Sequence, residues 1–198
     1  MALCLIWLLG NARALPAQDL SDFGHVFGSS SAKVEVVEFL DFGCVQCADF
    51  NELVFGQVYR EFVVTGLVRW RVIPFVAGRF RHSAFAAEAA ECAAEQDKYL
   101  VMQDSLLTRR SDWSTLGSPT TALATIARDA GLNGAAFDEC VRSQRMRPRV
   151  RAQKTAALSQ KVYGTPTFIF PGERRVLGAV PLEQFRAMLR SEIKASQP

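Results

Sequence analysis

The sequence has few histidines, little net charge and no apolar segment at its N-terminus long enough to cross a membrane. Its 198 residues include two histidines, and the formal net charge is +3 at pH 7. So small a positive charge argues against a nucleic-acid partner. The apolar run from Ala2 to Gly10 is too short to span a bilayer. No glycine-rich phosphate loop is present, so no nucleotide or flavin cofactor is expected, and no metal is implied.

The cysteines are what the sequence does contain. With 49% apolar residues, 13 glycines and 8 prolines, the composition is that of an ordinary folded chain. A chain of this length buries enough surface to fold without disulfides standing in for a core. It nevertheless has five cysteines, at positions 4, 44, 47, 92 and 140.

The N-terminus resembles a secretory signal. Ala12-Arg13-Ala14 follows the apolar run and places small residues where a signal peptidase reads them, which predicts a signal peptide over residues 1–14 and cleavage after Ala14. Ala17 is a second possible cleavage position, and a buried N-terminal strand or helix is the alternative to export. No basic residue precedes the apolar run. Cleavage would remove Cys4 and leave four cysteines in an oxidising compartment, the periplasm or cell envelope.

The pattern between residues 33 and 74 predicts a βαβ unit. Lys33 to Phe42 reads as a buried strand, apolar residues at helical spacing follow from Phe50 to Phe62, and Leu67 to Pro74 reads as a second strand. Two strands joined by one helix are parallel, with a right-handed crossover. Residues 15–32 are expected to be a polar lead-in.

A helical block and a second β-containing segment follow. Residues 82–162 are rich in helix formers, with expected helices from Ser118-Pro119 to Ala130, over Gly134–Ser143 and over Arg147–Val162. Phe168 to Phe170 and Arg175 to Leu177 read as strands, and Pro181 to Ile193 reads as a final helix. The fold class is therefore α/β, with residues 15–80 and 163–198 forming one domain and residues 81–162 an all-helical insertion.

Cys44-Val45-Gln46-Cys47 lies at the junction of the first strand and its helix. Unpaired N–H groups and the helix dipole at this position favour a thiolate, so Cys44 is expected to attack and the deeper Cys47 to resolve the mixed disulfide. Zinc and copper sites use the same spacing, but zinc would need further ligands, and His25 and His82 stand apart in the sequence. Redox chemistry is the favoured interpretation.

Thr165-Pro166 precedes the expected third strand. A cis peptide bond here would bring the Thr165 backbone beside the sulfurs, where it could pair with an extended client peptide. An ordinary trans turn is the alternative.

Together these segments resemble the DsbA-like branch of the thioredoxin superfamily, from about His25 to the C-terminus. VEVVEFLDFGCVQC is similar to that family's strand and redox turn, GTPTFIF to its cis-proline strand, AAECAAEQ to the first helix of its helical insertion, and GAVPLEQF to the start of its last helix. The resemblance implies thiol–disulfide exchange on cysteine-containing client proteins, with Val45, Gln46, Thr165 and Pro166 contacting the substrate.

The resemblance also assigns a role to Glu38, six residues before Cys44. The family has a buried acid there, and burial should raise the pKa of this carboxyl and let it accept or relay the proton of Cys47. A solvent-facing acid is the alternative. Strongly oxidising relatives have Pro-His between the cysteines. Val45-Gln46 supplies no charge, which would leave Cys44 to helix-end electrostatics alone and make a weaker oxidant.

Cys92 and Cys140 fall in two different expected helices. Export and the even number of cysteines favour pairing, and some members of the family have a second disulfide in the helical domain. We expect a Cys92–Cys140 cross-link, the alternative being two reduced core thiols.

The remaining expectations concern partners and direction. The basic run from Arg142 to Lys154 is interpreted as a solvated helix face, with a redox-partner surface as the alternative, and His82 as a loop or cap residue. The expected protein is a monomer that exchanges electrons with a membrane-bound or thioredoxin-like partner. An oxidase is favoured, because no dimerisation domain precedes residue 25; a reductase, an isomerase, a copper(I)-binding module and a redox-inactive interaction protein are the alternatives.

Overall fold

The computed structural model describes residues 19–197, and the expected signal peptide lies outside them. A five-stranded sheet has the order β1-β3-β2-β4-β5, in which β2 and β3 are parallel and every other pair is antiparallel. The strands are β1 (His25–Phe27), β2 (Val34–Leu40), β3 (Val68–Pro74), β4 (Thr167–Ile169) and β5 (Arg175–Leu177). The expected βαβ unit and the later pair of strands are thus present.

The central strand β2 is buried on both faces. Val36 and Leu40 belong to the main core, whereas Val37 and Phe39, which point the other way, belong to a second cluster. A strand covered on both sides has a nearly continuous apolar sequence, which explains why VEVVEFL does not alternate.

A continuous helical rod follows β2 and covers the face of the sheet on which Val36 and Leu40 lie. It comprises α1 (Val45–Phe50), two π-helical turns η1 (Asn51–Phe55) and η2 (Tyr59–Val63), and α2 (Gly56–Val58) between them. Phe50, Val54, Val58 and Phe62 recur at helical spacing and are all buried. The last helix, α9 (Leu182–Ala195), packs beside this rod through Phe185, whose ring centroid lies 5.2 Å from that of Phe50.

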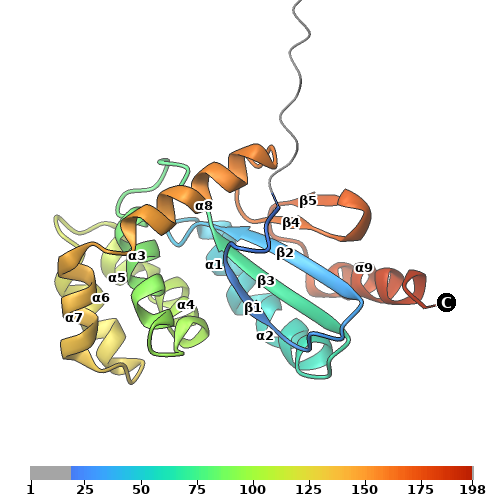
Figure 1. Ribbon diagram of the computed structural model, residues 1–198, viewed down its shortest axis with the longest axis horizontal. Helices are drawn as coiled ribbons and strands as arrows, with labels where there is room; N and C mark the ends of the chain where they lie inside the picture. The colour runs from blue at the N-terminus through green and yellow to red at the C-terminus, as the bar shows by residue number, and fades with distance from the viewer. Residues whose placement is uncertain (1–18, 198) are drawn as a thin grey trace, which may run out of the picture.

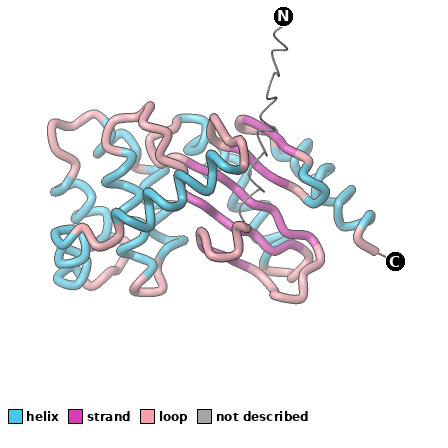
Figure 2. The backbone as a smooth tube through the Cα atoms, turned by 45° about the horizontal axis from the view of Figure 1, so that its top comes forward, coloured by secondary structure: helices cyan, strands magenta, loops and turns pink. Residues whose placement is uncertain are grey.

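Six helices lie between β3 and β4. They are α3 (Ser83–Ala94), α4 (Tyr99–Thr108), α5 (Arg110–Ser114), α6 (Thr120–Asp129), α7 (Gly134–Ser143) and α8 (Arg147–Ser159). Five of them gather at one end of the sheet, and α8 runs from there back over the strands, where Ala157 packs with Val37 and Phe39 (Figures 1 and 2). The expected disulfide is confirmed: Cys92 on α3 and Cys140 on α7 are bonded, with their Cα atoms 5.8 Å apart. No helix among the described residues is long and apolar enough to span a bilayer.

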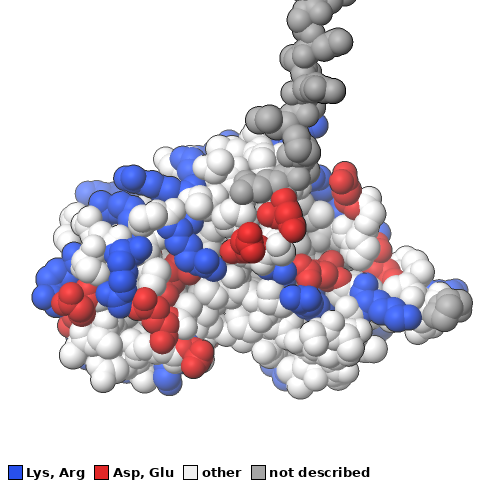
Figure 3. Space-filling view, viewed as in Figure 1, with Lys and Arg blue, Asp and Glu red and all other residues white. Residues whose placement is uncertain are grey.

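The basic run differs from the expected solvated face. Arg147 and Arg149 form ion pairs with Glu88 and Glu91 of α3, and Arg145 forms one with Glu95, the residue that follows α3. Glu88 and Glu91 are buried, and a buried carboxylate requires such a partner. Figure 3 shows basic side chains over α7 and α8 with acidic ones among them. Much of the run therefore joins α8 to α3.

Three elements depart from the sequence-based expectation. The lead-in contains β1, which pairs with β3. The strongly helical sequence over residues 84–107, where no break was expected, is divided between α3 and α4 by a turn in which Asp97 has a φ of 56°. The short helix α5 was not expected either.

Candidate active site

The C-x-x-C motif lies where β2 ends and α1 begins. Cys44 has extended backbone angles at the N-cap of α1, and Cys47 lies one turn further along the helix. Both are free thiols. Cys44 is 4% exposed and Cys47 1%, so Cys44 is the outer of the two, although most of its surface is covered.

The outer thiol, Cys44, is more acidic than an ordinary cysteine. A hydrogen bond from Cys47 is the largest of the effects that lower its pKa to about 6, and the backbone N–H groups of Gln46 and Cys47 add to it. The sequence suggested that helix-end electrostatics alone would stabilise the Cys44 thiolate. The hydrogen bond from Cys47 shows that a second effect contributes. A thiol one helical turn away supplies part of the stabilisation that a charged neighbour would provide.

The inner thiol, Cys47, has the opposite character. Burial raises its pKa well above the ordinary value, and the negative charges of Cys44 and Glu38 raise it further. The pair therefore consists of one thiol that is readily ionised and one that holds its proton.

The segment that precedes β4 lies against the outer sulfur. The Thr165–Pro166 peptide bond is cis, and the Thr165 carbonyl oxygen lies 3.2 Å from Cys44 Sγ. The Pro166 carbonyl accepts a hydrogen bond from the Gly178 N–H at 2.8 Å, which ties this segment to β5. Residues 44 and 165 are far apart in sequence, and the sheet brings them together.

Between the cysteines, Val45 and Gln46 face solvent, and Val45 is 50% exposed. The Gln46 amide lies against Gly178, where an added Cβ would sit 3.3 Å from Gln46 Oε1. The outer rim of the site therefore contains an apolar side chain and an amide, and both are uncharged.

Glu38 is buried on β2 and is 2% exposed. Its Oε2 accepts a hydrogen bond from Trp70 Nε1 at 3.0 Å. Burial raises the pKa of this carboxyl to about 7, and the Trp70 hydrogen bond opposes the rise. A group with this pKa exchanges protons near neutrality, which is the property expected of a proton acceptor.

A second buried acid, Asp41, escaped the sequence reasoning. It is 1% exposed, and its Oδ1 accepts hydrogen bonds from the Gly43 N–H at 2.9 Å and from the Ser83 hydroxyl. Burial raises its pKa to about 6. Its position after a buried strand and three residues before Cys44 could have indicated a buried acid near the redox turn. Its hydrogen-bond partner Ser83 could not be predicted, because it is 42 positions away in the sequence.

Gly43 is fixed by close packing. An added Cβ would lie 2.5 Å from both Phe80 Cβ and Ser83 Oγ, a separation that real Cβ atoms do not show. The loop that leads into α3 therefore presses directly on the residue before Cys44. Nearby, His82 occupies the N-cap of α3, and its Nε2 lies 2.8 Å from the Leu116 carbonyl oxygen.

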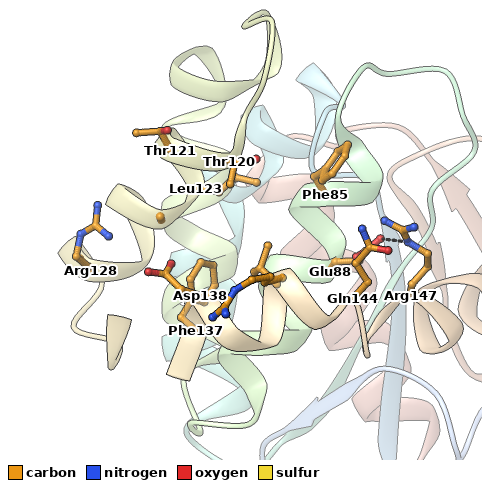
Figure 4. A pocket seen from close by; sticks show the side chains of 13 residues that line it. Phe85, Glu88, Thr120, Thr121, Leu123, Arg128, Phe137, Asp138, Gln144 and Arg147 are labelled. Atoms are coloured by element: carbon orange, nitrogen blue, oxygen red, sulfur yellow. Dashed lines mark hydrogen bonds and ion pairs between the residues drawn. The ribbon is translucent and has the colours of Figure 1, made fainter. Parts of the chain in front are cut away.

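A cavity of about 540 Å³ lies away from the sulfurs, among α3, α6 and α7 (Figure 4). Phe85, Leu123 and Phe137 line it, and the ion pair between Glu88 and Arg147 closes one edge. Neither cysteine of the C-x-x-C motif borders it. Among residues 19–197 no three His, Cys, Asp or Glu side chains gather as metal ligands would.

The fold and the site together define a class: a thioredoxin fold with a helical insertion and a thiol pair at its first helix. The Wolbachia pipientis protein alpha-DsbA1 has the same fold, with a TM-score of 0.78 and 18% identity over 86% of this chain and 91% of that one. The family model described as Thioredoxin matches residues 21–191. The chain belongs to the thioredoxin family, and the resemblance to the DsbA-like fold is confirmed.

Two curated relatives are longer than this chain. It is 21% identical to the putative protein-disulfide oxidoreductase of Rickettsia prowazekii over 77% of its own length and 56% of the relative's. It is 32% identical to the Na(+)/H(+) antiporter NhaA 3 of Salinispora tropica over 89% of its length, but this is 26% of the antiporter. The chain thus spans about half of one relative and about a quarter of the other.

Proposed function

We propose that the chain is an exported thiol–disulfide oxidoreductase that introduces disulfides into client proteins through Cys44 and Cys47. The observation that carries the proposal is the asymmetry of the pair. The pKa of Cys44 is lowered to about 6, whereas that of Cys47 is raised well above its usual value. The name of the Rickettsia relative, a putative protein-disulfide oxidoreductase, agrees with this chemistry.

The exchange begins with the Cys44–Cys47 disulfide. A client thiolate attacks Cys44 Sγ, the bond between the two cysteines breaks, and Cys47 leaves as a thiolate that takes up a proton, with Glu38 as its buried exchange partner. The second client thiolate attacks the client sulfur of the mixed disulfide and releases Cys44 as a thiolate. The client loses two electrons and two protons and gains a disulfide, and the chain becomes a dithiol.

The segment at Thr165 and Pro166 would hold the client backbone during this exchange. The Thr165 carbonyl points at Cys44, so an extended client segment can pair with this backbone and present its own sulfur to Cys44. Val45 and Gln46 would contact the client from the other side, because both are exposed.

The direction of transfer follows from the thiolate. Stabilising Cys44 as a thiolate favours the reduced chain over its disulfide, and this makes the disulfide an oxidant. Turnover then needs a partner that accepts two electrons, a thioredoxin-like or quinone-linked membrane protein. We further propose a monomer in which residues 81–162 are inserted between the halves 15–80 and 163–198.

Export is proposed from two features. Residues 1–14 have the pattern of a signal peptide, and the Cys92–Cys140 disulfide suits an oxidising compartment. N-terminal sequencing of protein recovered from the periplasm of a bacterial host should begin at Leu15. Recovery of the uncut chain in the cytoplasm would refute export.

Oxidised protein mixed with a reduced two-cysteine peptide should form one peptide disulfide per chain, and Cys44→Ser should abolish this. Equilibration with a glutathione series then assigns the direction. A potential above about −200 mV identifies an oxidase, and one near about −270 mV identifies a reductase. An unchanged rate in Cys44→Ser would contradict the proposed chemistry.

A further inference from the structure

A cavity of about 420 Å³ lies beside the cis-proline segment. It opens between the loop before α3, the chain that follows α8, and strand β5. We call it the basic subsite; Arg79, Lys161, Tyr163, Gly164, Arg175 and Leu177 are among the residues that line it.

The basic subsite adjoins the reactive sulfur. Gly164 precedes Thr165, whose carbonyl oxygen lies 3.2 Å from Cys44 Sγ. The opposite wall also adjoins the redox turn, because Arg79 precedes Phe80, the residue packed against Gly43. A client segment whose sulfur reaches Cys44 can therefore extend its neighbouring residues over this cavity.

The cations of the basic subsite are not neutralised. Arg79, Lys161 and Arg175 are exposed, no acidic residue lines the cavity, and within residues 19–197 no carboxylate lies at ion-pair distance from any of the three. Arg175 donates instead to the backbone carbonyl of Gln160, which bears no charge. The arginines between α8 and α3 differ, because each of those is paired with a glutamate.

Two exposed apolar side chains border the same cavity. Tyr163 is 65% exposed and Leu177 70% exposed. Leu177 packs over the backbone at Gly164, where an added Cβ would lie 3.0 Å from Leu177 Cδ1. Exposed aromatic and aliphatic groups beside unpaired cations are typical of a surface that binds a polypeptide with acidic residues.

We infer that the basic subsite selects clients whose reactive cysteine is flanked by acidic side chains. This rests on the proposed thiol–disulfide exchange at Cys44 and names the substrate class for it. Acidic side chains over the cavity meet the charges of Arg79, Lys161 and Arg175, and the adjacent client side chains pack on Tyr163 and Leu177. This attraction speeds the association of the client with the protein and stabilises the mixed disulfide, so it raises kcat/KM for acidic clients.

The test compares three reduced two-cysteine peptides with Glu, Gln or Lys at the positions two before and two after the first cysteine. Rates with the oxidised protein are divided by rates with hydroxyethyl disulfide, a neutral disulfide, which removes the effect of each sequence on its own thiol. We expect kcat/KM for the Glu peptide to exceed that for the Gln peptide about fivefold at low salt, with the Lys peptide slowest. At about 0.5 M salt the three values should converge.

Variants assign the preference to the cavity. Lys161→Glu should remove most of the preference for the Glu peptide or reverse it. Lys33→Glu is the matched control, because it changes the net charge equally but lies at the far end of β2 from the redox turn; its preference should equal that of the wild type. Arg79→Glu should act as Lys161→Glu does.

Two results would separate failure of the inference from failure of the proposed function. If all three peptides are oxidised at equal normalised rates, or if Lys33→Glu and Lys161→Glu behave alike, the basic subsite does not select clients. If no peptide is oxidised while the hydroxyethyl disulfide controls react, the proposed exchange activity itself fails.

Discussion

Replacing Glu38 with glutamine should stabilise the fold in a way that depends on pH. The carboxyl is 2% exposed, and burial raises its pKa from an ordinary 4.5 to about 7. Below pH 4.5 this carboxyl is protonated in both the folded and the unfolded state, and it does not lower the free energy of unfolding. As the pH rises, the carboxyl ionises first in the unfolded chain, which stabilises that state and lowers the free energy of unfolding. This loss is complete above pH 7.

The size of the effect follows from the two pKa values. A difference of roughly two and a half pKa units corresponds to about 3 kcal/mol of unfolding free energy at pH 8, since each unit is worth about 1.4 kcal/mol. Glutamine cannot ionise, and its carbonyl can still accept the hydrogen bond from Trp70 Nε1. The effect of the added amide group on the free energy of unfolding is the same at every pH. Only the pH dependence of the difference between Glu38→Gln and the wild type therefore reports on ionisation.

The assay is urea unfolding between pH 4 and pH 8, with Cys44 and Cys47 reduced and two free thiols verified by titration. We expect the advantage of Glu38→Gln over the wild type to grow by about 3 kcal/mol across this range. Glu52→Gln, at an exposed position, is the control and should show no such trend. A difference that stays flat for Glu38→Gln would refute the ionisation of a buried carboxyl.

Three further predictions concern the disulfide, the redox turn and the reactive thiol. Because the disulfide closes a loop with a sequence separation of 48, replacing Cys92 and Cys140 together with alanine should lower the free energy of unfolding by about 4 kcal/mol in urea; an unchanged midpoint would contradict this. Gly43→Ala should cost about 1–3 kcal/mol and slow peptide oxidation, whereas Gly117→Ala, which meets nothing within 4 Å, should do neither. Iodoacetamide alkylation of reduced Cys44 should have its midpoint near pH 6, and a midpoint above about pH 8 would show that the thiolate is not stabilised.

The chemistry of this chain was more predictable from sequence than its long-range contacts. A buried strand that runs straight into a helix places Cys44 and Cys47 at a helix N-terminus, and this depends only on local pattern. The position of Thr165 beside Cys44 was predicted as the consequence of a cis peptide bond before the third strand, whereas an ordinary trans turn was the alternative that the residues also allowed. Local periodicity specifies elements, and the sheet order specifies which of their ends meet.

The structural features that the sequence did not predict depend on contacts between distant segments. Strand β1 has three residues, and it pairs with β3, more than forty positions later. The hydrogen bond from Ser83 to Asp41 joins α3 to the redox turn across 42 positions. The arginines that follow α7 were interpreted as a solvated face because their partners lie on α3 or directly after it, between 50 and 59 positions earlier. No periodicity in a single segment reports such pairs.

The helical insertion is joined to the redox turn at both of its ends. At its start, Ser83 donates to Asp41 and packs against Gly43. At its end, the chain leaving α8 runs through the basic subsite to Thr165 and the outer sulfur. The ion pairs between α8 and α3 and the disulfide between α3 and α7 link the helices that adjoin these two ends. The insertion therefore does more than enlarge the protein: its contacts support both the residue that precedes Cys44 and the segment that leads to the Thr165 backbone.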